Sequence, residues 1–122
     1  NNPNVGSGQL DGNGIPADFF TDINVRKCFN YAFDYDAYIS QVLQGQGQQI
    51  TMALPTSYLG YDPEVPTYSF DMTAAQEACQ AAWDGQVWEQ GFELTIAYNT
   101  GSDDRQAVAE ILKLNLEFLN PK

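Results

Sequence analysis

The charged side chains that could do chemistry in this sequence are almost all carboxylates. The chain holds 16 Asp and Glu residues against 5 Lys and Arg, and it has no histidine. Without histidine, neither a Ser-His-Asp nor a Cys-His catalytic arrangement can form within this chain. Two acidic pairs, Asp34 with Asp36 and Asp103 with Asp104, place carboxylates close together in the sequence. Glycoside hydrolysis needs two carboxyl groups that face each other across a cleft, whereas adjacent acids at helix starts are usually caps, so we predict no catalytic residue and no enzyme.

Metal binding is not predicted either. Cys28 and Cys79 are too few for a four-ligand zinc site. Residues 11–14, Asp-Gly-Asn-Gly, look like the start of a calcium loop, but the fifth and twelfth positions of an EF-hand would fall on Ile15 and Asp22, which do not fit. We therefore interpret residues 11–14 as a turn and expect no metal ion and no cofactor.

The acidic composition restricts the possible partners. The formal net charge is −11, and Arg26 with Lys27 is the only adjacent basic pair. Nucleic acids and anionic membranes are bound by clustered Lys and Arg, so neither is an expected partner. No apolar run approaches the ~20 residues of a membrane-spanning helix.

The best candidates for ligand binding follow the clearest strand pattern. Residues 92–98 alternate apolar and polar side chains, which predicts a strand, and they lead through a Gly-containing loop into a helix start. Free N–H groups at a helix start suit a carboxylate or a peptide carbonyl, which makes Tyr98, Asn99 and Thr100 candidate ligand contacts. The alternative is that this loop only caps the helix, because the acids at 103 and 104 would repel a carboxylate.

A second candidate surface lies in residues 46–69, which are rich in Pro and Gly and predict a long irregular loop. Tyr58 and Tyr61 could form an aromatic wall for the side chains of a ligand. Packing of the same aromatic residues over the core is the alternative.

The elements that would position these residues are mostly helical. Residues 1–18 predict a loop or linker. Asp22 is expected to cap a helix over 23–33 with one apolar stripe, and Asp34 to cap a second helix over 35–44 that ends at Gly45. The first stripe consists of Val25, Cys28, Phe29 and Ala32, and the inner face of the second helix consists of Tyr35, Tyr38, Ile39 and Val42. Arg26 is expected to pair with a carboxylate such as Asp22 or Asp34.

Two more helices and an incomplete sheet complete the prediction. Thr73 and Gln76 match a capping box for a helix over 73–83, which Asp84-Gly85 breaks. Ser102 or Asp103 is expected to start the longest helix, which runs to Leu119. One strand cannot form a sheet, so residues 92–98 need partners from sequence outside this chain, from a short strand over 50–54, or from another copy by self-association.

Four segments, in order, resemble motifs of the family 5 extracellular solute-binding proteins. Residues 22–34 resemble the family's D-x-x-V-R-x-A-x-x-Y-A-x-D segment, and residues 55–62 resemble its P-x-x-x-x-G-Y-D loop. Phe70-Asp71 resembles the start of a family helix, and residues 91–101 resemble the strand and helix that follow. The resemblance covers about residues 19–120 of the chain.

The resemblance implies an α/β architecture in which residues 19–122 form one partial lobe of a periplasmic-binding-protein type II fold, mostly helical with one clear strand and an incomplete sheet. It implies the substrate-capture component of an ABC importer that binds a peptide between two lobes, with permease subunits as partners. It also implies an extracytoplasmic location, periplasmic or tethered at the cell surface. In dipeptide-binding relatives, the loop that corresponds to residues 98–100 approaches the ligand. An oligosaccharide receptor of the same family, or an interaction domain that associates through its strand edge, is the alternative.

The two cysteines depart from the family's usual pattern. Cys28 stands where the family usually has Ala, and Cys79 where it usually has Leu. Both positions face the predicted core, so they hold either two buried thiols or one disulfide between the first and third helices. We favour two free thiols.

Overall fold

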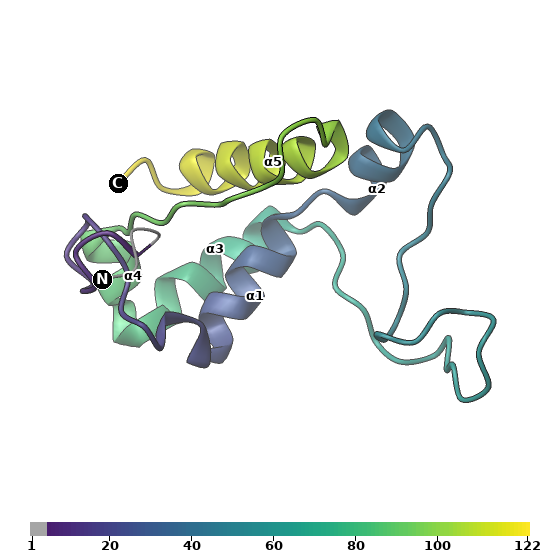
Figure 1. The fold of residues 1–122 in the computed structure, drawn as a ribbon. Helices are drawn as coiled ribbons and strands as arrows, with labels where there is room; N and C mark the ends of the chain where they lie inside the picture. The colour runs from purple at the N-terminus through teal and green to yellow at the C-terminus, as the bar shows by residue number, and fades with distance from the viewer. Residues whose placement is uncertain (1–4) are drawn as a thin grey trace.

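The computed structural model describes residues 5–122, and the regular elements in that range are helices. Helix α1 (Ile23–Ala32) packs along helix α3 (Met72–Ala81), and helix α5 (Asp103–Leu119) lies over this pair, as Figure 1 shows. The prediction of a mostly helical chain is therefore confirmed.

Helix α1 begins at the predicted cap. One carboxylate oxygen of Asp22 accepts a hydrogen bond from the Asn24 N–H at 2.7 Å. The other accepts one from the Trp83 N–H at 2.6 Å, so a single side chain joins the helix start to a residue 61 positions later. On the inner face of α1, three members of the predicted stripe are buried, namely Val25, Cys28 and Ala32.

Arg26 does not pair with a carboxylate, so that prediction was wrong. Its guanidinium donates to the backbone carbonyls of Phe20 and Thr21, in the 3-10 turn that precedes α1 (Phe19–Thr21). The carboxylate of Asp34 is engaged as a cap instead, because it accepts a bond from the Ala37 N–H at 2.9 Å. The arginine thus closes the 3-10 turn onto the helix.

The predicted helix over 35–44 forms with an unexpected winding. Helix α2 (Tyr35–Ala37) is a single turn that continues into a π-helical turn, η3 (Tyr38–Val42), where the Leu43 N–H donates to the Tyr38 carbonyl at 3.1 Å. The helix ends at Gly45 as predicted, with φ of 77°, and Gln44 before it also has a positive φ of 52°. The π spacing changes the direction of the following side chains relative to an α-helix, and π turns concentrate at functional sites.

Helix α3 starts with a different cap from the predicted one. Asp71 is the N-cap, and its carboxylate accepts hydrogen bonds from the Thr73 and Ala74 N–H groups, both at 3.0 Å. The Thr73–Gln76 capping box was therefore a wrong prediction, because Asp71, two residues earlier, is the cap and accepts from the first free N–H groups.

The predicted break after α3 is a left-handed turn. Trp83, Asp84 and Gly85 have φ values of 51°, 54° and 90° within the 3-10 segment η4 (Ala82–Gly85). With this reversal, Trp83 donates two hydrogen bonds to the segment before α1. Its backbone N–H donates to the Asp22 carboxylate, and its indole N–H donates to the Phe19 carbonyl at 3.1 Å. A short helix, α4 (Gln86–Gln90), which was not predicted, follows the turn.

Neither predicted strand forms in the part of the chain that the structure describes. Residues 92–98 run extended beside α5, but their backbone forms no ladder with a described segment, and residues 50–54 form bends in a loop. The predicted alternation is present in the packing, since Phe92 and Leu94 pack against the core while Glu93 and Thr95 are exposed. A strand requires hydrogen bonds to a neighbour, and local alternation cannot provide the neighbour.

The core consists of two small clusters of buried residues, and the smaller cluster contains a disulfide. Cys28 and Cys79 are bonded, with a Cα–Cα distance of 5.0 Å, so the prediction of two free thiols was wrong. The bond joins α1 to α3 where both helices bury small side chains. The fully or nearly fully buried apolar residues are Ile15, Phe19, Val25, Cys28, Ala32, Ala75, Ala78, Cys79, Ala82 and Val87.

Helix α5 has the predicted extent but a shallow contact with the core. None of its residues is fully buried, and Leu114 and Phe118 are 66% and 83% exposed on its outer side. Its Asn115 amide donates to the Ala32 carbonyl at 2.7 Å, which ties the helix to the end of α1. No helix between residues 5 and 122 combines the length and the hydropathy that crossing a membrane would require.

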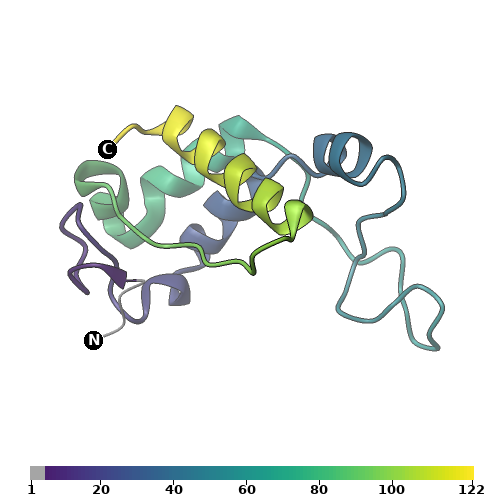
Figure 2. The same cartoon turned by 45° about the horizontal axis from the view of Figure 1, so that its top comes forward.

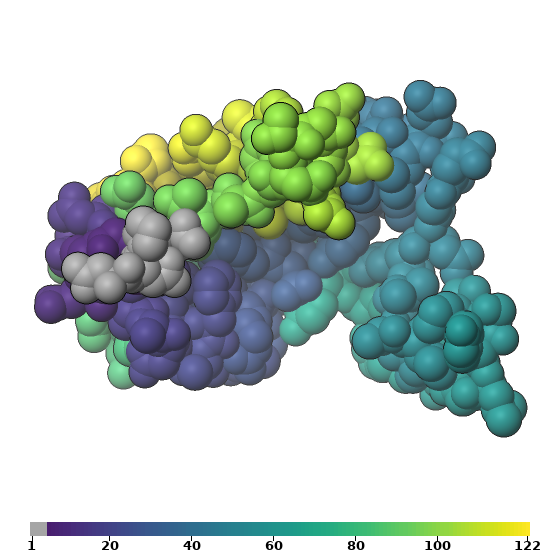
Figure 3. All heavy atoms as spheres, viewed as in Figure 1, coloured from purple at the N-terminus to yellow at the C-terminus, as the bar shows by residue number. Residues whose placement is uncertain are grey.

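Residues 46–70 form a loop that extends away from the helices. Figures 1 and 2 show this segment projecting from the helices between α2 and the start of α3, and Figure 3 shows it as a separate lobe of atoms. Its long-range hydrogen bonds include those from the Gln49 amide to the Tyr68 carbonyl, at 2.7 Å, and from the Thr51 hydroxyl to the Asp62 carbonyl. The predicted irregular loop is therefore confirmed.

Candidate functional site

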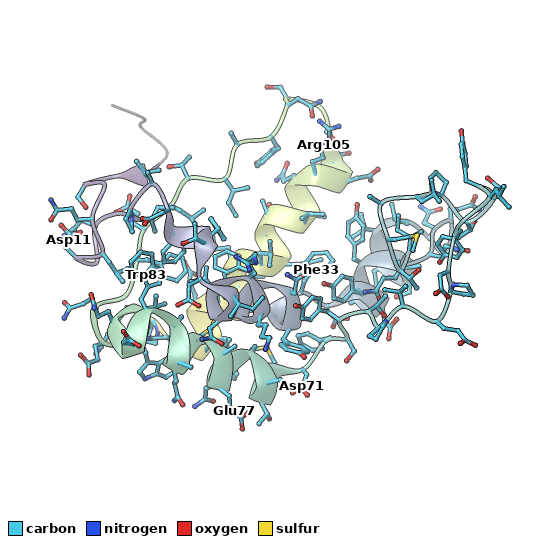
Figure 4. All side chains as sticks on the ribbon, turned by 90° about the horizontal axis from the view of Figure 1, so that it is seen from below. Asp11, Phe33, Asp71, Glu77, Trp83 and Arg105 are labelled. Atoms are coloured by element: carbon cyan, nitrogen blue, oxygen red, sulfur yellow. A yellow bond between two sulfur atoms is a disulfide. The ribbon has the colours of Figure 1, made fainter. Side chains whose placement is uncertain are left out.

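The turn before α5 carries three of the predicted ligand contacts. Tyr98, Asn99 and Thr100 are all exposed. The side-chain oxygen of Asn99 accepts a hydrogen bond from the Arg105 guanidinium at 2.7 Å, and its carbonyl accepts one from the Ser102 N–H at 3.3 Å. Figure 4 shows Arg105 at the start of α5, on the opposite side of the molecule from α3. Asn99 is thus fixed to the first turn of the helix, and Thr100 next to it is exposed.

The electrostatics of this helix start favour a neutral ligand group. Ser102 is the N-cap residue but makes no side-chain capping bond, so the first N–H groups of α5 have no side-chain acceptor. Asp103 and Asp104 occupy the first turn and add negative charge beside those donors. A carboxylate would be repelled there, whereas a peptide carbonyl could accept a hydrogen bond without that repulsion.

A groove of about 440 Å³ separates residues 91–98 from α5, and we refer to it as the α5 groove. Its apolar floor includes the predicted row Phe92, Leu94, Ile96 and Tyr98, together with Leu116 and Leu119 of the helix. Charged side chains line its rim, namely Glu93, Glu110, Lys113, Glu117 and Lys122. Tyr98 therefore joins this groove, while Asn99 and Thr100 lie beyond its lining.

The structure does not bring Tyr58 and Tyr61 to the same place. Tyr58 is 62% exposed near the tip of the loop, and its carbonyl accepts a bond from the Tyr61 N–H at 3.1 Å. In both Figure 1 and Figure 2 the loop tip lies well away from the turn at residues 98–100. The two groups of candidates thus form separate surfaces on this chain.

A second groove, of about 700 Å³, lies at the base of the loop, and we refer to it as the neutral groove. It is lined by the end of α1, by α2 with η3, by both ends of the loop and by α5. Its lining residues are Phe29, Asn30, Phe33, Tyr35, Tyr38, Ile39, Leu43, Gln48, Gln49, Ile50, Thr51, Pro66, Thr67, Tyr68, Val108 and Leu112. In the space-filling view of Figure 3, the outline of the molecule is notched between the helical body and the loop.

Sequence reasoning missed the neutral groove. The periodicity of residues 35–42 predicted a face buried in the core, and in the structure this face is only half-buried. Loop residues from 48–51 and 66–68 supply the opposite wall, and nothing in their local sequence indicates that they face a helix. The one available signal was the number of aromatic side chains on a helix followed directly by a long loop.

Tyr35 places a partly buried hydroxyl in the lining of the neutral groove. Burial raises the pKa of the Tyr35 hydroxyl above its usual value of 10.0, and the nearby Tyr68 adds to the rise. The hydroxyl donates a hydrogen bond to the Asn30 side-chain oxygen at 3.2 Å. The phenol is therefore neutral at physiological pH and acts as a fixed hydrogen-bonding group.

The predicted turn at residues 11–14 is an Asx turn. The Asp11 carboxylate accepts hydrogen bonds from the Asn13 N–H at 2.9 Å and from the Ser7 hydroxyl at 2.8 Å. The bond from the Asn13 N–H, and to a smaller extent the bond from Ser7, lowers the pKa of Asp11 below its usual value of 3.8. The carboxylate is thus used within its own loop. Between residues 5 and 122, no group of three or more His, Cys, Asp or Glu side chains lies close enough to hold a metal ion.

Two grooves therefore open on the described part of the chain, one beside α5 and one at the base of the loop. Both grooves have apolar walls, but charged side chains line the α5 groove and none lines the neutral groove. The sequence profile of the bacterial extracellular solute-binding proteins, family 5 middle region, matches residues 2–120. The chain therefore belongs to family 5 of the extracellular solute-binding proteins, as the sequence motifs predicted.

Individual relatives agree with this assignment. The chain is 27% identical over 93 residues to heme-binding protein A of Haemophilus influenzae, and 27% identical over 96 residues to a probable D,D-dipeptide-binding periplasmic protein of Escherichia coli. It is 29% identical over 112 residues to an oligopeptide-binding protein of Bacillus subtilis. These alignments cover 76%, 79% and 82% of this chain but only 17%, 18% and 20% of the relatives. No solved structure matches the chain significantly.

Proposed function

We propose that this chain is part of the substrate-capturing receptor of an ABC importer, and that the receptor binds peptides between two lobes. The family match over residues 2–120 carries the proposal. Relatives named for dipeptide, D,D-dipeptide and oligopeptide binding support a peptide as the ligand. The permease subunits of the importer would be the partners, and the receptor would work outside the cytoplasm, in the periplasm or tethered at the cell surface.

The chain would contribute part of one lobe of a periplasmic-binding-protein type II fold. The relatives are about five to six times as long as the matched segment, since the alignments cover only 17–20% of them. The extended and unpaired backbone of residues 92–98 supports this architecture, because other strands of such a lobe would supply its hydrogen-bond partners. The apolar floor of the α5 groove would then be covered by the side chains of those strands.

Tyr98, Asn99 and Thr100 are the proposed ligand contacts within this segment. Thr100 and the uncapped N–H groups of α5 could bind a peptide carbonyl, and the Arg105 bond keeps Asn99 in a fixed orientation beside them. Tyr58 and Tyr61, which are exposed on the loop, would contact the ligand only if lobe closure brought the loop tip to it.

Thermal unfolding of the receptor that carries this segment tests the function. The receptor is melted with separate pools of short peptides, oligosaccharides and nickel salts. A ligand that binds only the folded state stabilises it by about 2.7 kcal/mol at a hundredfold excess over the dissociation constant, which is a measurable rise in Tm. We expect the rise with peptides. A rise with oligosaccharides alone would keep the importer but replace the ligand.

The loop assignment has its own control. Asn99→Ala should reduce the peptide-induced rise in Tm, because it frees the turn from Arg105. Gln106→Ala, at the residue after Arg105 in α5, removes an amide that bonds to the Glu110 carboxylate at 2.7 Å and should leave the rise unchanged. If no pool stabilises the receptor and the chain self-associates, the importer proposal is wrong. The chain is then better explained as an interaction domain that pairs through residues 92–98.

A further inference from the structure

The loop at residues 46–70 has little structure that would keep a protease out. None of its residues is buried, and none belongs to a helix or a strand. At its tip, the Tyr58 N–H donates to the Pro55 carbonyl and the Tyr61 N–H to the Tyr58 carbonyl, which are the bonds of single turns. An endoprotease binds several residues in an extended form, so it cuts where such a stretch opens at low cost. Exposed loop tips are the segments that open in this way, and Figure 3 shows the loop projecting from the helices.

The peptide bond between Tyr58 and Leu59 lies at the tip of the loop. The side chains of the two residues are 62% and 103% exposed. Endoproteases with an apolar specificity pocket bind an aromatic side chain on the N-terminal side of the bond that they cut. Proline beside such a bond would restrict the backbone and remove an N–H donor, but the nearest prolines, Pro55 and Pro63, lie three or more residues away. Tyr58–Leu59 is therefore a bond that such an enzyme can reach and recognise.

Proteases that select basic residues have no target in the loop. No Lys or Arg lies between residues 28 and 104. An enzyme whose specificity pocket carries an aspartate, as trypsin does, therefore finds no bond to cut there. The composition of the loop thus favours an enzyme with an apolar pocket.

The disulfide encloses the loop in a covalent ring. Cys28 and Cys79 lie on either side of residues 46–70 in the sequence and are bonded to each other. A cut after residue 58 gives the pieces 1–58 and 59–122, which remain one molecule through this bond. Since the connection is covalent, it holds whatever sequence flanks the chain. The two cysteines are 1% and 6% exposed, so a reductant reaches the bond only when the helical body opens.

The two pieces are also held together by contacts that do not involve the loop. Helix α1 belongs to the first piece and packs along α3, which belongs to the second. The Asp22 carboxylate accepts the bond from the Trp83 N–H, and the Asn115 amide donates to the Ala32 carbonyl, so both bonds cross from one piece to the other. A cut at the tip of the loop therefore removes no contact of the core.

The extended segment at residues 92–98 is the rival target for the same enzyme. It exposes Tyr98, and its backbone forms no ladder with a described segment. Phe92 and Leu94 pack against the core and hold this segment to the body, whereas no side chain of the loop is buried. A cut after Tyr98 would fall outside the disulfide ring, so residues 99–122 would separate in denaturant without any reductant. The two targets therefore give different products.

From these observations we propose that the loop at residues 46–70 is a cleavage site for an endoprotease with an apolar specificity pocket, and that the disulfide holds the products as one two-chain protein. The enzyme hydrolyses the bond between Tyr58 and Leu59 with one water molecule. The water oxygen joins the Tyr58 carbonyl carbon to give a carboxylate, and both water protons end on the Leu59 nitrogen to give an ammonium group. The proposal does not depend on the proposed receptor function.

Cleavage would change the neutral groove without unfolding the body. The two arms of the loop, residues 46–58 and 59–70, supply one wall of this groove and would each gain a free end. The bond from the Gln49 amide to the Tyr68 carbonyl would still join the arms at their base. Hydrogen exchange should therefore quicken in residues 46–70 after the cut and stay unchanged in α1 and α3.

Limited proteolysis of the 122-residue chain tests the site. The chain is treated with a small amount of chymotrypsin, and in parallel with trypsin, and the products are weighed by mass spectrometry in denaturant with and without reductant. The first chymotrypsin product should be a single species, heavier than the chain by one water, that reductant separates into 1–58 and 59–122. It should keep a cooperative thermal transition. Trypsin should leave residues 28–104 uncut.

Two variants at one position locate the cut. Leu59→Pro removes the N–H and fixes the backbone on the C-terminal side of the bond, so cleavage there should be lost. Leu59→Ala keeps the N–H and the backbone freedom and should be cut like the native chain. Because the Leu59 side chain is fully exposed, both variants should fold, and thermal melts without protease check this.

The receptor that carries this segment shows whether the site stays open in the longer protein. After the same treatment with chymotrypsin, N-terminal sequencing should find a new amino terminus at Leu59. The absence of this terminus would overturn the proposal, as would a first cut after Tyr98. Equal cleavage of Leu59→Pro and Leu59→Ala, or loss of the cooperative transition in the cut chain, would overturn it too. None of these results depends on which ligand stabilises the receptor, so failure here is distinguishable from failure of the importer function.

Discussion

The helical body and the loop at residues 46–70 are stabilised in different ways. The body joins segments far apart in the sequence through a disulfide, a buried apolar core and the two bonds of Asp22. The loop contains no buried residue, and its long-range bonds are hydrogen bonds of exposed side chains. The free energy needed to unfold a segment rises with its burial and cross-linking. The body should therefore unfold only together with the whole molecule, while the loop should unfold locally.

This difference also affects the neutral groove. The neutral groove has one wall on the rigid body and one on the loop. A wall that can move at low cost changes the width of this groove, while the aromatic wall on the body keeps its shape. The predictions below test the contrast between body and loop, beginning with the largest expected effect.

The disulfide should contribute most. It closes a ring across a sequence separation of 51 residues, and the loss of chain entropy in the unfolded state is worth about 4 kcal/mol for a ring of this size. The double variant Cys28→Ala/Cys79→Ala should therefore lower the free energy of unfolding by about that amount in urea denaturation. Adding reductant in the denaturant should weaken the native protein and leave the double variant unchanged. Equal stability of the two proteins would contradict the prediction.

Asp22 should have the next largest effect. Asp22→Ala removes the cap of α1 and leaves the Trp83 N–H without its carboxylate partner, which together should cost about 2 kcal/mol of unfolding free energy. Asp18→Ala is the matched control, because Asp18 precedes the 3-10 turn without a side-chain capping bond. If both alanine variants unfold at the same urea concentration, the Asp22 bonds to Asn24 and Trp83 do not stabilise the helical body.

Two leucines compare the regions directly. Leu94→Ala truncates a side chain that packs against the core and should cost about 2 kcal/mol. Leu59→Ala truncates a fully exposed side chain, at 103% relative exposure, and should change stability by less than about 0.5 kcal/mol. Thermal melts of the two variants measure the contrast, and a large effect at Leu59 would show that the loop packs on the body in solution.

Gln49 should act on the loop alone. Gln49→Ala removes the bond to the Tyr68 carbonyl, worth about 1 kcal/mol or less at an exposed site. Hydrogen exchange should therefore quicken in residues 46–70 while exchange in α1 and α3 stays unchanged. Gln46→Ala, in the same exposed stretch, is the control and should alter neither. Faster exchange throughout the molecule would mean that loop and body unfold together.

Much of the local structure followed from short stretches of sequence. Aspartates at 22 and 34 predicted helix starts, because an aspartate can satisfy free N–H groups of the next turn within a few residues. Gly45 predicted a helix end for a similarly local reason, since glycine adopts a positive φ at little cost. The motifs between residues 22 and 101 also identified the family, which the profile match confirmed.

The exposed candidates were predicted only in part. Tyr98 takes its place in the α5 groove because alternation determines which side chains of an extended segment face the same way. That Tyr58 and Tyr61 lie far from Tyr98 was not predictable, because the path of an irregular loop depends on many weak contacts along its length. The neutral groove was missed for the same reason, since loop and helices meet there from four places in the sequence.

What the sequence determined by itself was therefore local and compositional: where helices start and stop, the alternation of residues 92–98, the acidic charge and the family. Only the tertiary structure decided whether Cys28 and Cys79 bond, which donor Asp22 reaches, whether residues 92–98 have a pairing partner, and where a charge-free groove opens. A cap needs only neighbours along the chain. A disulfide, a sheet or a groove requires residues far apart in the sequence to come within a few ångströms, and packing of the whole chain decides that distance.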